Sequence, residues 1–272
     1  MKRIFTCLVI TFLIIGIAGL TSCKSRTEKA QEAIEKQQVD TISREIKENV
    51  YPLPTSAEII KLLTDLEVGY QIGLTNPVEK VKKYFSSQER ALNLGSYGAD
   101  LSYVTLYNQS QEVIDYLATI RSLTNELQMS RIYNESIMDS LKANEDNKAR
   151  LVEILTETFN ETYAFLSDND QQNLALLVVG GAWVEGMYLT TNVSEAAYNV
   201  STISGVLLGQ KKSFDRYLEI TEPYMTDQGV ANFVKSLDPI KNVYAGLSTS
   251  LTEKNILDIK KAMEGIRRQV VQ

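Results

Sequence analysis

The chain has 272 residues, with 28 basic against 34 acidic side chains, a formal net charge of −6 and no histidine. This acidic balance argues against a nucleic-acid-binding protein, because such proteins usually present a basic surface. The lack of histidine excludes histidine-based catalytic triads and removes the imidazole ligands of the usual zinc and di-iron sites. We find no glycine-rich phosphate loop, no dinucleotide fingerprint and no EF-hand-like acidic loop, so we expect no metal and no cofactor.

The start of the chain has the pattern of an export signal. Lys2 and Arg3 precede an apolar run over residues 4–20, and small residues follow it. This order is typical of a secretory signal peptide. The sequence Leu20-Thr21-Ser22-Cys23 resembles the bacterial lipobox, and this resemblance implies lipid on Cys23 once residues 1–22 are removed. An uncleaved membrane-spanning helix, which needs ~20 apolar residues, is the alternative, but it leaves the cysteine and its small neighbours unexplained.

Acylation of Cys23 would make a lipid bilayer the first partner of this chain. Two acyl chains give a stable anchor, whereas one gives only marginal binding. Loss of Lys2 and Arg3 leaves 26 basic against 34 acidic side chains, a formal charge of −8, so electrostatic attraction to anionic lipid is not expected. The other cysteine, Cys7, lies in the segment that would be removed, so the domain must be stable without a disulfide. We expect a cell-envelope location, on the outer membrane in preference to the inner, with the face left open.

The rest of the chain divides into a tether and one domain. Residues 23–50 are rich in Lys, Glu, Gln and Arg, which is typical of a tether or a solvated helix. Tyr51-Pro52-Leu53-Pro54 interrupts this pattern, because proline disfavours helix in the residue before it. We therefore place the domain at residues 51–272.

Apolar residues in this domain recur at three- and four-residue steps, and no segment alternates long enough to predict a strand. The sequence therefore predicts an all-α, multi-helix domain. A capping box at Thr55 opens the first helix, and Pro77 is expected at the first helical position of a short one that includes Phe85. The further helices are expected at about 88–107, 111–127, 133–143, 148–166, 171–193, 196–220, 228–237, 239–249 and 253–270. In the second of these, we place Val113, Ile114, Leu117, Ile120 and Leu123 on one apolar face.

Two segments of the domain resemble each other at an offset of 85 residues. Residues 98–105 and 183–190 share an acid, a tyrosine and a threonine at matching positions, and glycines precede both. A duplicated multi-helix unit, giving a helical-repeat-like fold, would account for this similarity. Two copies fall short of a sustained period, so duplication and chance both stay open.

Small residues share a face in each of these segments. Gly95, Ala99 and Ser102 lie at three- and four-residue steps in the first, and Ala182 and Gly186 in the second. Such a face lets another backbone approach closely. We therefore favour a close crossing of two central helices over space for a ligand.

Asp100 and Glu185 are the candidate catalytic residues. Tyr103 and Tyr188 follow them three residues later, on the same helix face. One interpretation is a buried hydrogen bond from each tyrosine to its neighbouring carboxylate. The other is a pair of facing carboxylates that performs acid–base chemistry or holds a metal. We favour the structural interpretation, and we treat Tyr103, Tyr188 and the single tryptophan, Trp183, as ligand-binding candidates, although core packing accounts for them more simply.

Three stretches, residues 76–79, 91–103 and 181–186, resemble a set of lipoproteins from Bacteroidetes. The resemblance spans most of residues 51–250. It implies an exported helical protein and brings no catalytic residues.

We therefore expect a lipid-anchored binding or scaffold module of the cell envelope, without catalytic activity, whose second partner is an envelope protein. Two alternatives stay open: a small-ligand carrier with a tyrosine-lined cavity, and a hydrolase or lyase that uses Asp100 and Glu185.

Overall fold

The computed structural model describes residues 69–195, 200–247 and 250–272, and within these ranges the chain is helical and contains no strand. The predicted all-α, multi-helix class is confirmed. The described residues belong to one compact unit, Ile42–Gln272. The predicted signal peptide, Cys23, the tether and the helix that opens at Thr55 lie outside the described residues.

The helices follow the predicted order and differ from the expected ranges by only a few residues. They are η2 (Val78–Lys83), α4 (Ser87–Leu106), α5 (Ser110–Glu126), α6 (Glu135–Ala143), α7 (Lys148–Asp168), α8 (Gln172–Glu195), α9 (Val200–Thr221), η3 (Glu222–Tyr224), α10 (Gln228–Ser236), α11 (Asp238–Ala245) and α12 (Glu253–Val270).

The short helix near Pro77 differs from the prediction. It is a 3₁₀-helix, Pro77 precedes it, and Phe85 lies beyond its end with 77% of its surface exposed. A capping box is the reason, because Ser86 accepts a hydrogen bond from the Glu89 amide while the Glu89 carboxylate accepts from the amides of Ser86 and Phe85. The start of α4 therefore fixes the backbone of Phe85 in the preceding turn.

The apolar face predicted for α5 is also too wide. Ile120 and Leu123 are buried, but 41% of Ile114 is exposed. Buried α5 residues pack toward α4 and η2, which are its main neighbours. Ile114 therefore lies on a side of α5 that these neighbours leave uncovered.

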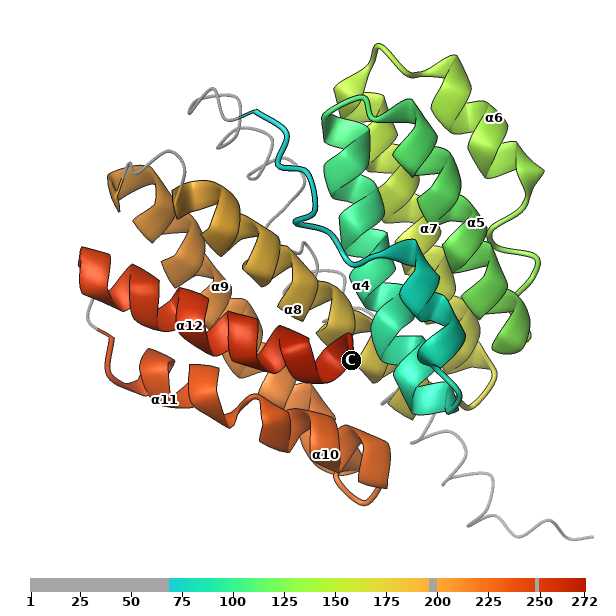
Figure 1. Cartoon of the computed structure of the whole chain (residues 1–272). Helices are drawn as coiled ribbons and strands as arrows, with labels where there is room; N and C mark the ends of the chain where they lie inside the picture. The colour runs from blue at the N-terminus through green and yellow to red at the C-terminus, as the bar shows by residue number, and fades with distance from the viewer. Residues whose placement is uncertain (1–68, 196–199, 248–249) are drawn as a thin grey trace, which may run out of the picture. The chain divides into compact units, whose positions relative to one another are not determined.

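The two halves of the domain lie on either side of a central helix pair (Figure 1). Helices α4 to α7 form one group and α8 to α12 the other, and α4 and α8 meet between them. Their mutual contact is the most extensive between any two described helices. On the outer sides, α5 and α7 pack against α4, and α12 packs against α8.

Glycines bring the backbones of α4 and α8 into direct contact. A Cβ atom at Gly95 would lie 2.0 Å from the carbonyl oxygen of Val178, and one at Gly181 would lie 1.9 Å from that of Leu92. Neither distance is compatible with any side chain. The predicted close crossing is therefore confirmed, and the space beside these glycines holds backbone rather than ligand.

The crossing bears on the internal similarity. Helices α4 and α8 begin 85 residues apart, at Ser87 and Gln172, which matches the offset between the two similar segments. The contacts of Leu92 with Gly181 and of Ser96 with Glu185 advance in the same direction, so the helices cross in parallel. Equivalent helices of a duplicated unit would meet in this way. Duplication itself stays a prediction.

Substitution of the crossing glycines tests this contact. We expect Gly95→Ala and Gly181→Ala each to lower the free energy of unfolding by at least about 2 kcal/mol, because overpacking against an immobile backbone costs ~1–3 kcal/mol or more. Gly209→Ala in α9 is the matched control, since nothing lies within 4 Å of a Cβ there. It should be neutral or stabilise by about 0.5–1 kcal/mol. Chemical denaturation measures all three, and equal stabilities would contradict the crossing.

Candidate functional site

The two candidate carboxyl groups converge at the α4–α8 crossing. Asp100 comes from α4 and Glu185 from α8, and both side chains are fully buried. They lie close enough for the charge of Glu185 to raise the pKa of Asp100. Two like charges so close together repel each other, so a proton on one of the two groups is favoured. The structure therefore brings together the two acids that the sequence singled out.

Arg267 of α12 compensates the charge of Glu185. Its Nε lies 2.8 Å from both carboxylate oxygens and its Nη2 lies 2.7 Å from Oε1. Ser96 adds a hydrogen bond of 2.8 Å from its hydroxyl to Oε2. The guanidinium also lies 4.0 Å from the centre of the Tyr188 ring, where the negative face of the ring attracts it. Both carboxyl oxygens of Glu185 are thus bonded within a buried ion pair with Arg267.

Asp100 differs from Glu185 because no cation of the described residues bonds to it. Its Oδ2 accepts a hydrogen bond of 3.0 Å from the Asn76 amide, and its Oδ1 has no hydrogen-bond partner among these residues. Burial raises the pKa of Asp100 well above its usual range, the charge of Glu185 raises it further, and Arg267 only partly opposes them. Asp100 is therefore the group of the pair that favours holding a proton.

The charge of Arg267 is stable in this environment. Burial alone would lower the pKa of the guanidinium, but the charge of Glu185 and its hydrogen bonds more than offset this, so the pKa lies above its usual range. The cluster thus consists of a neutral carboxyl, a carboxylate and a guanidinium. It has no charge left over for a metal ion, and the described residues form no group of three or more acidic or thiol side chains that could hold one.

Tyrosines hold the loop that covers Asp100. Tyr116 donates a hydrogen bond of 2.9 Å to the Asn76 carbonyl, and Tyr97 donates one of 3.0 Å to the Pro77 carbonyl. The Asn76 side chain in turn donates to the Tyr84 hydroxyl at 3.2 Å. This loop shields the carboxyl pair from solvent.

The predicted pairing of Asp100 with Tyr103 and of Glu185 with Tyr188 is wrong. The Tyr103 hydroxyl accepts a hydrogen bond of 3.1 Å from the Gln71 amide, and Tyr188 contacts Arg267 through its ring. A spacing of three residues puts two side chains on one helix face, but a tyrosine hydroxyl reaches beyond a neighbouring carboxylate to the next element.

Arg267 was not identified from the sequence, although a signal exists. It lies four residues after Met263 and three before Val270, within the buried stripe of α12. A charged residue within an apolar stripe predicts a buried partner. Further bonds fix the end of this helix, because Asn93 donates to the Val270 carbonyl at 2.9 Å and Lys80 donates to the Val271 carbonyl at 2.7 Å.

Trp183 packs in the core, as favoured above. Its Nε1 donates to Gln210 Oε1 at 3.1 Å, and its ring stacks on Phe214 with a centroid distance of 5.1 Å. Neither Trp183 nor the candidates Tyr103 and Tyr188 line the surface pockets described below. The buried cluster and its neighbours therefore stabilise the fold and offer a substrate no contact in this structure.

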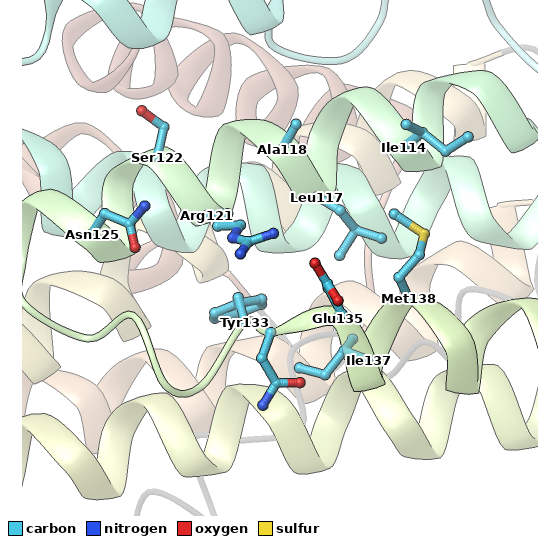
Figure 2. A pocket seen from close by; sticks show the side chains of 11 residues that line it. Ile114, Leu117, Ala118, Arg121, Ser122, Asn125, Tyr133, Glu135, Ile137 and Met138 are labelled. Atoms are coloured by element: carbon cyan, nitrogen blue, oxygen red, sulfur yellow. The ribbon is translucent and has the colours of Figure 1, made fainter.

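A concave surface that solvent can reach lies between α5 and α6. Two adjoining pockets of about 420 and 410 Å³ share Ile114 and Met138, and together they form what we call the α5–α6 groove. Figure 2 shows Leu117 and Arg121 of α5 pointing toward Met138 and Glu135 of the facing segment. Ile114 was expected in the core, so the sequence did not reveal this groove.

Comparison with known proteins adds no relative: no family model, no curated protein and no solved structure matches the chain. Its function is therefore inferred from its own residues.

The two carboxyl groups should respond differently to neutralisation. Glu185→Gln leaves Arg267 buried without an anion and should cost about 3–5 kcal/mol of stability, because breaking one side of a buried ion pair is strongly destabilising. Asp100→Asn keeps the side chain uncharged and retains an acceptor for the Asn76 amide, so at pH 5 we expect a change below about 1 kcal/mol. Chemical denaturation of both variants decides the point. Equal losses would mean that the proton is not on Asp100.

The raised pKa of Asp100 also predicts a pH dependence. Above about pH 4 the carboxyl group of Asp100 loses its proton in the unfolded chain but keeps it in the folded chain. The free energy of unfolding therefore falls as pH rises toward the pKa of the folded state. The wild type should therefore lose stability relative to Asp100→Asn by up to about 1.4 kcal/mol per pH unit across this window. Denaturation at pH 5, 6 and 7 measures the difference, and a pH-independent difference would contradict the assignment.

Proposed function

We propose that this chain is an exported lipoprotein, acylated on Cys23, whose helical domain is a binding module of the cell envelope. The anchor is supported by the basic start, the apolar run and the sequence Leu20-Thr21-Ser22-Cys23. Two acyl chains on that cysteine would hold the protein stably at a bilayer.

A second membrane segment is not needed for anchoring. Among the described residues, one stretch, Gln172–Asn192 in α8, is long and apolar enough to cross a membrane, with a mean hydropathy of 1.4. However, 94% of its most apolar 18-residue window is buried inside the fold, where α8 packs against α4. Its apolar composition is accounted for by this central position, so we assign the anchor to Cys23.

The α5–α6 groove is the observation that supports a binding role. It places partly exposed apolar side chains, Ile114 and Met138, beside polar and charged ones in a concave surface. Concave, mainly apolar surfaces with a few polar groups are typical of binding sites. By contrast, Asp100 and Glu185 are buried and bonded to the protein itself, so we do not favour the hydrolase or lyase alternative.

A small-ligand carrier is the second candidate function. Each pocket has a volume within the range of roughly 300–1,000 Å³ that is common for small-molecule sites. The predicted tyrosine-lined cavity does not support it, because Tyr133 is the one tyrosine in the linings of the two pockets.

Lipidation is tested by metabolic labelling with a clickable fatty acid in the native host. We expect label on the wild type and on Cys7→Ser, and none on Cys23→Ser, because Cys23 is the proposed acyl acceptor. Cys7 is the matched control, since it is the only other cysteine. The labelled protein should partition into the detergent phase and Cys23→Ser should accumulate as the longer precursor. Equal labelling of Cys23→Ser would rule out the anchor.

A further inference from the structure

The α5–α6 groove extends along α5. Its α5 wall runs from Ser110 to Asn125, about 22 Å at a rise of 1.5 Å per residue. Helix α6 packs on α7 and makes only sparse contact with α5, which leaves the space between them open. In Figure 1, α6 lies at the outer side of the α4–α7 group. A groove of this length matches a helix of about 15 residues.

The two pockets follow one another along α5. The first is bounded on α5 by Ile114 to Asn125, and the second by Ser110 to Ile114. A helix that lies along α5 presents a side chain to the groove every three or four residues, or about every 5.4 Å. Exposed Ala118 lies midway on the α5 wall and lets a partner backbone approach. Apolar residues on one face of such a helix would therefore enter both pockets in turn.

Charged side chains line both ends of the groove. Arg121 and Glu135 line the first pocket, whereas Lys142, Glu145 and Asp146 line the second, which is net negative. No ion pair joins any of these side chains to another described residue. The acidic end at the second pocket attracts the positive N-terminal end of a helix and basic residues near it, whereas the charges of Arg121 and Glu135 at the first pocket offset each other.

From this geometry we infer that the α5–α6 groove docks an amphipathic helix of a partner protein, which lies parallel to α5 with a basic N-terminal end beside Glu145 and Asp146. The inference rests on the proposed binding role of the groove and names the class of its partner. Helices in grooves are a common mode of peptide recognition, read out by apolar side chains on one face. A compact small molecule would fill one pocket and leave the other, and the charges of both ends, unused.

A designed peptide tests the inference on the full chain in phospholipid nanodiscs. The probe is a fluorescent peptide of about 15 residues with leucines at heptad spacing, lysine near its N-terminus and glutamate near its C-terminus. A second probe, dodecanoate, represents a small apolar ligand. We measure fluorescence anisotropy for the peptide and calorimetric binding for dodecanoate, and subtract the signal of empty nanodiscs.

Ile114 and Leu257 give a matched pair of variants. They are 41% and 42% exposed, and Ile114 lies in both pockets whereas Leu257 lies on α12. Ile114→Asp should weaken peptide binding at least about tenfold, and Leu257→Asp should leave it within about twofold. Ala118→Trp fills the groove without a buried charge and should also block the peptide. Thermal unfolding checks that each variant folds.

The outcomes separate the helix partner from the binding role. Saturable peptide binding that Ile114→Asp and Ala118→Trp abolish, and that weakens when the peptide charges are exchanged, supports the inference. Peptide binding that Ile114→Asp leaves intact, or that Leu257→Asp weakens equally, overturns it. Binding of dodecanoate alone, lost in Ile114→Asp, overturns the helix partner but keeps the binding role. Failure of both probes to bind the wild type overturns both.

Discussion

The backbone contact between α4 and α8 is the constraint on which the rest of the structure depends. Gly95 and Gly181 let the two helices approach until a Cβ atom on either would overlap a carbonyl oxygen of the other. The same two helices bury Asp100 and Glu185 close to each other. One must then hold a proton, and the other must find a cation, which Arg267 of α12 supplies. The C-terminal helix is thus held by an interaction that the central crossing makes necessary.

Helix positions could be predicted from the sequence because they follow from the spacing of apolar residues within each segment. Apolar steps of three and four residues mark each described α-helix. The close crossing could also be predicted, since a glycine inside an apolar helix usually marks a tightly packed neighbour. Phe85 and Ile114 could not be placed correctly, because both are apolar and only their neighbours in space decide whether they are covered.

The candidate site was predicted in part. The sequence singled out Asp100 and Glu185, but Arg267 lies 82 residues from Glu185 along the chain, and Asn76 lies 24 residues from Asp100. Such pairs leave no local pattern, and the tyrosines three residues away offered a false local partner. The α5–α6 groove could not be predicted either. It depends on how α6 packs against α7, and the sequence of a single helix does not show this.

The charged groups in the interior and those on the surface support different roles. Buried acids in a cleft are a usual mark of catalysis, but here the protein itself bonds to them, and the tyrosine-held loop covers them. Such a network specifies how three helices meet. We therefore place the proposed binding role on the outer surface, where the groove combines exposed apolar side chains with charges that have no ion-pair partner among the described residues.

The most direct test is whether Asp100 is protonated at neutral pH. A buried structural network requires this proton, whereas a solvent-accessible acid–base pair does not. Infrared difference spectroscopy of the full chain at pH 7 detects a protonated carboxyl group by its carbonyl band. We predict such a band in the wild type and its loss in Asp100→Asn. A wild-type spectrum without it at pH 7, in which the band emerges only near pH 4 with the ordinary carboxyl groups, would contradict the account.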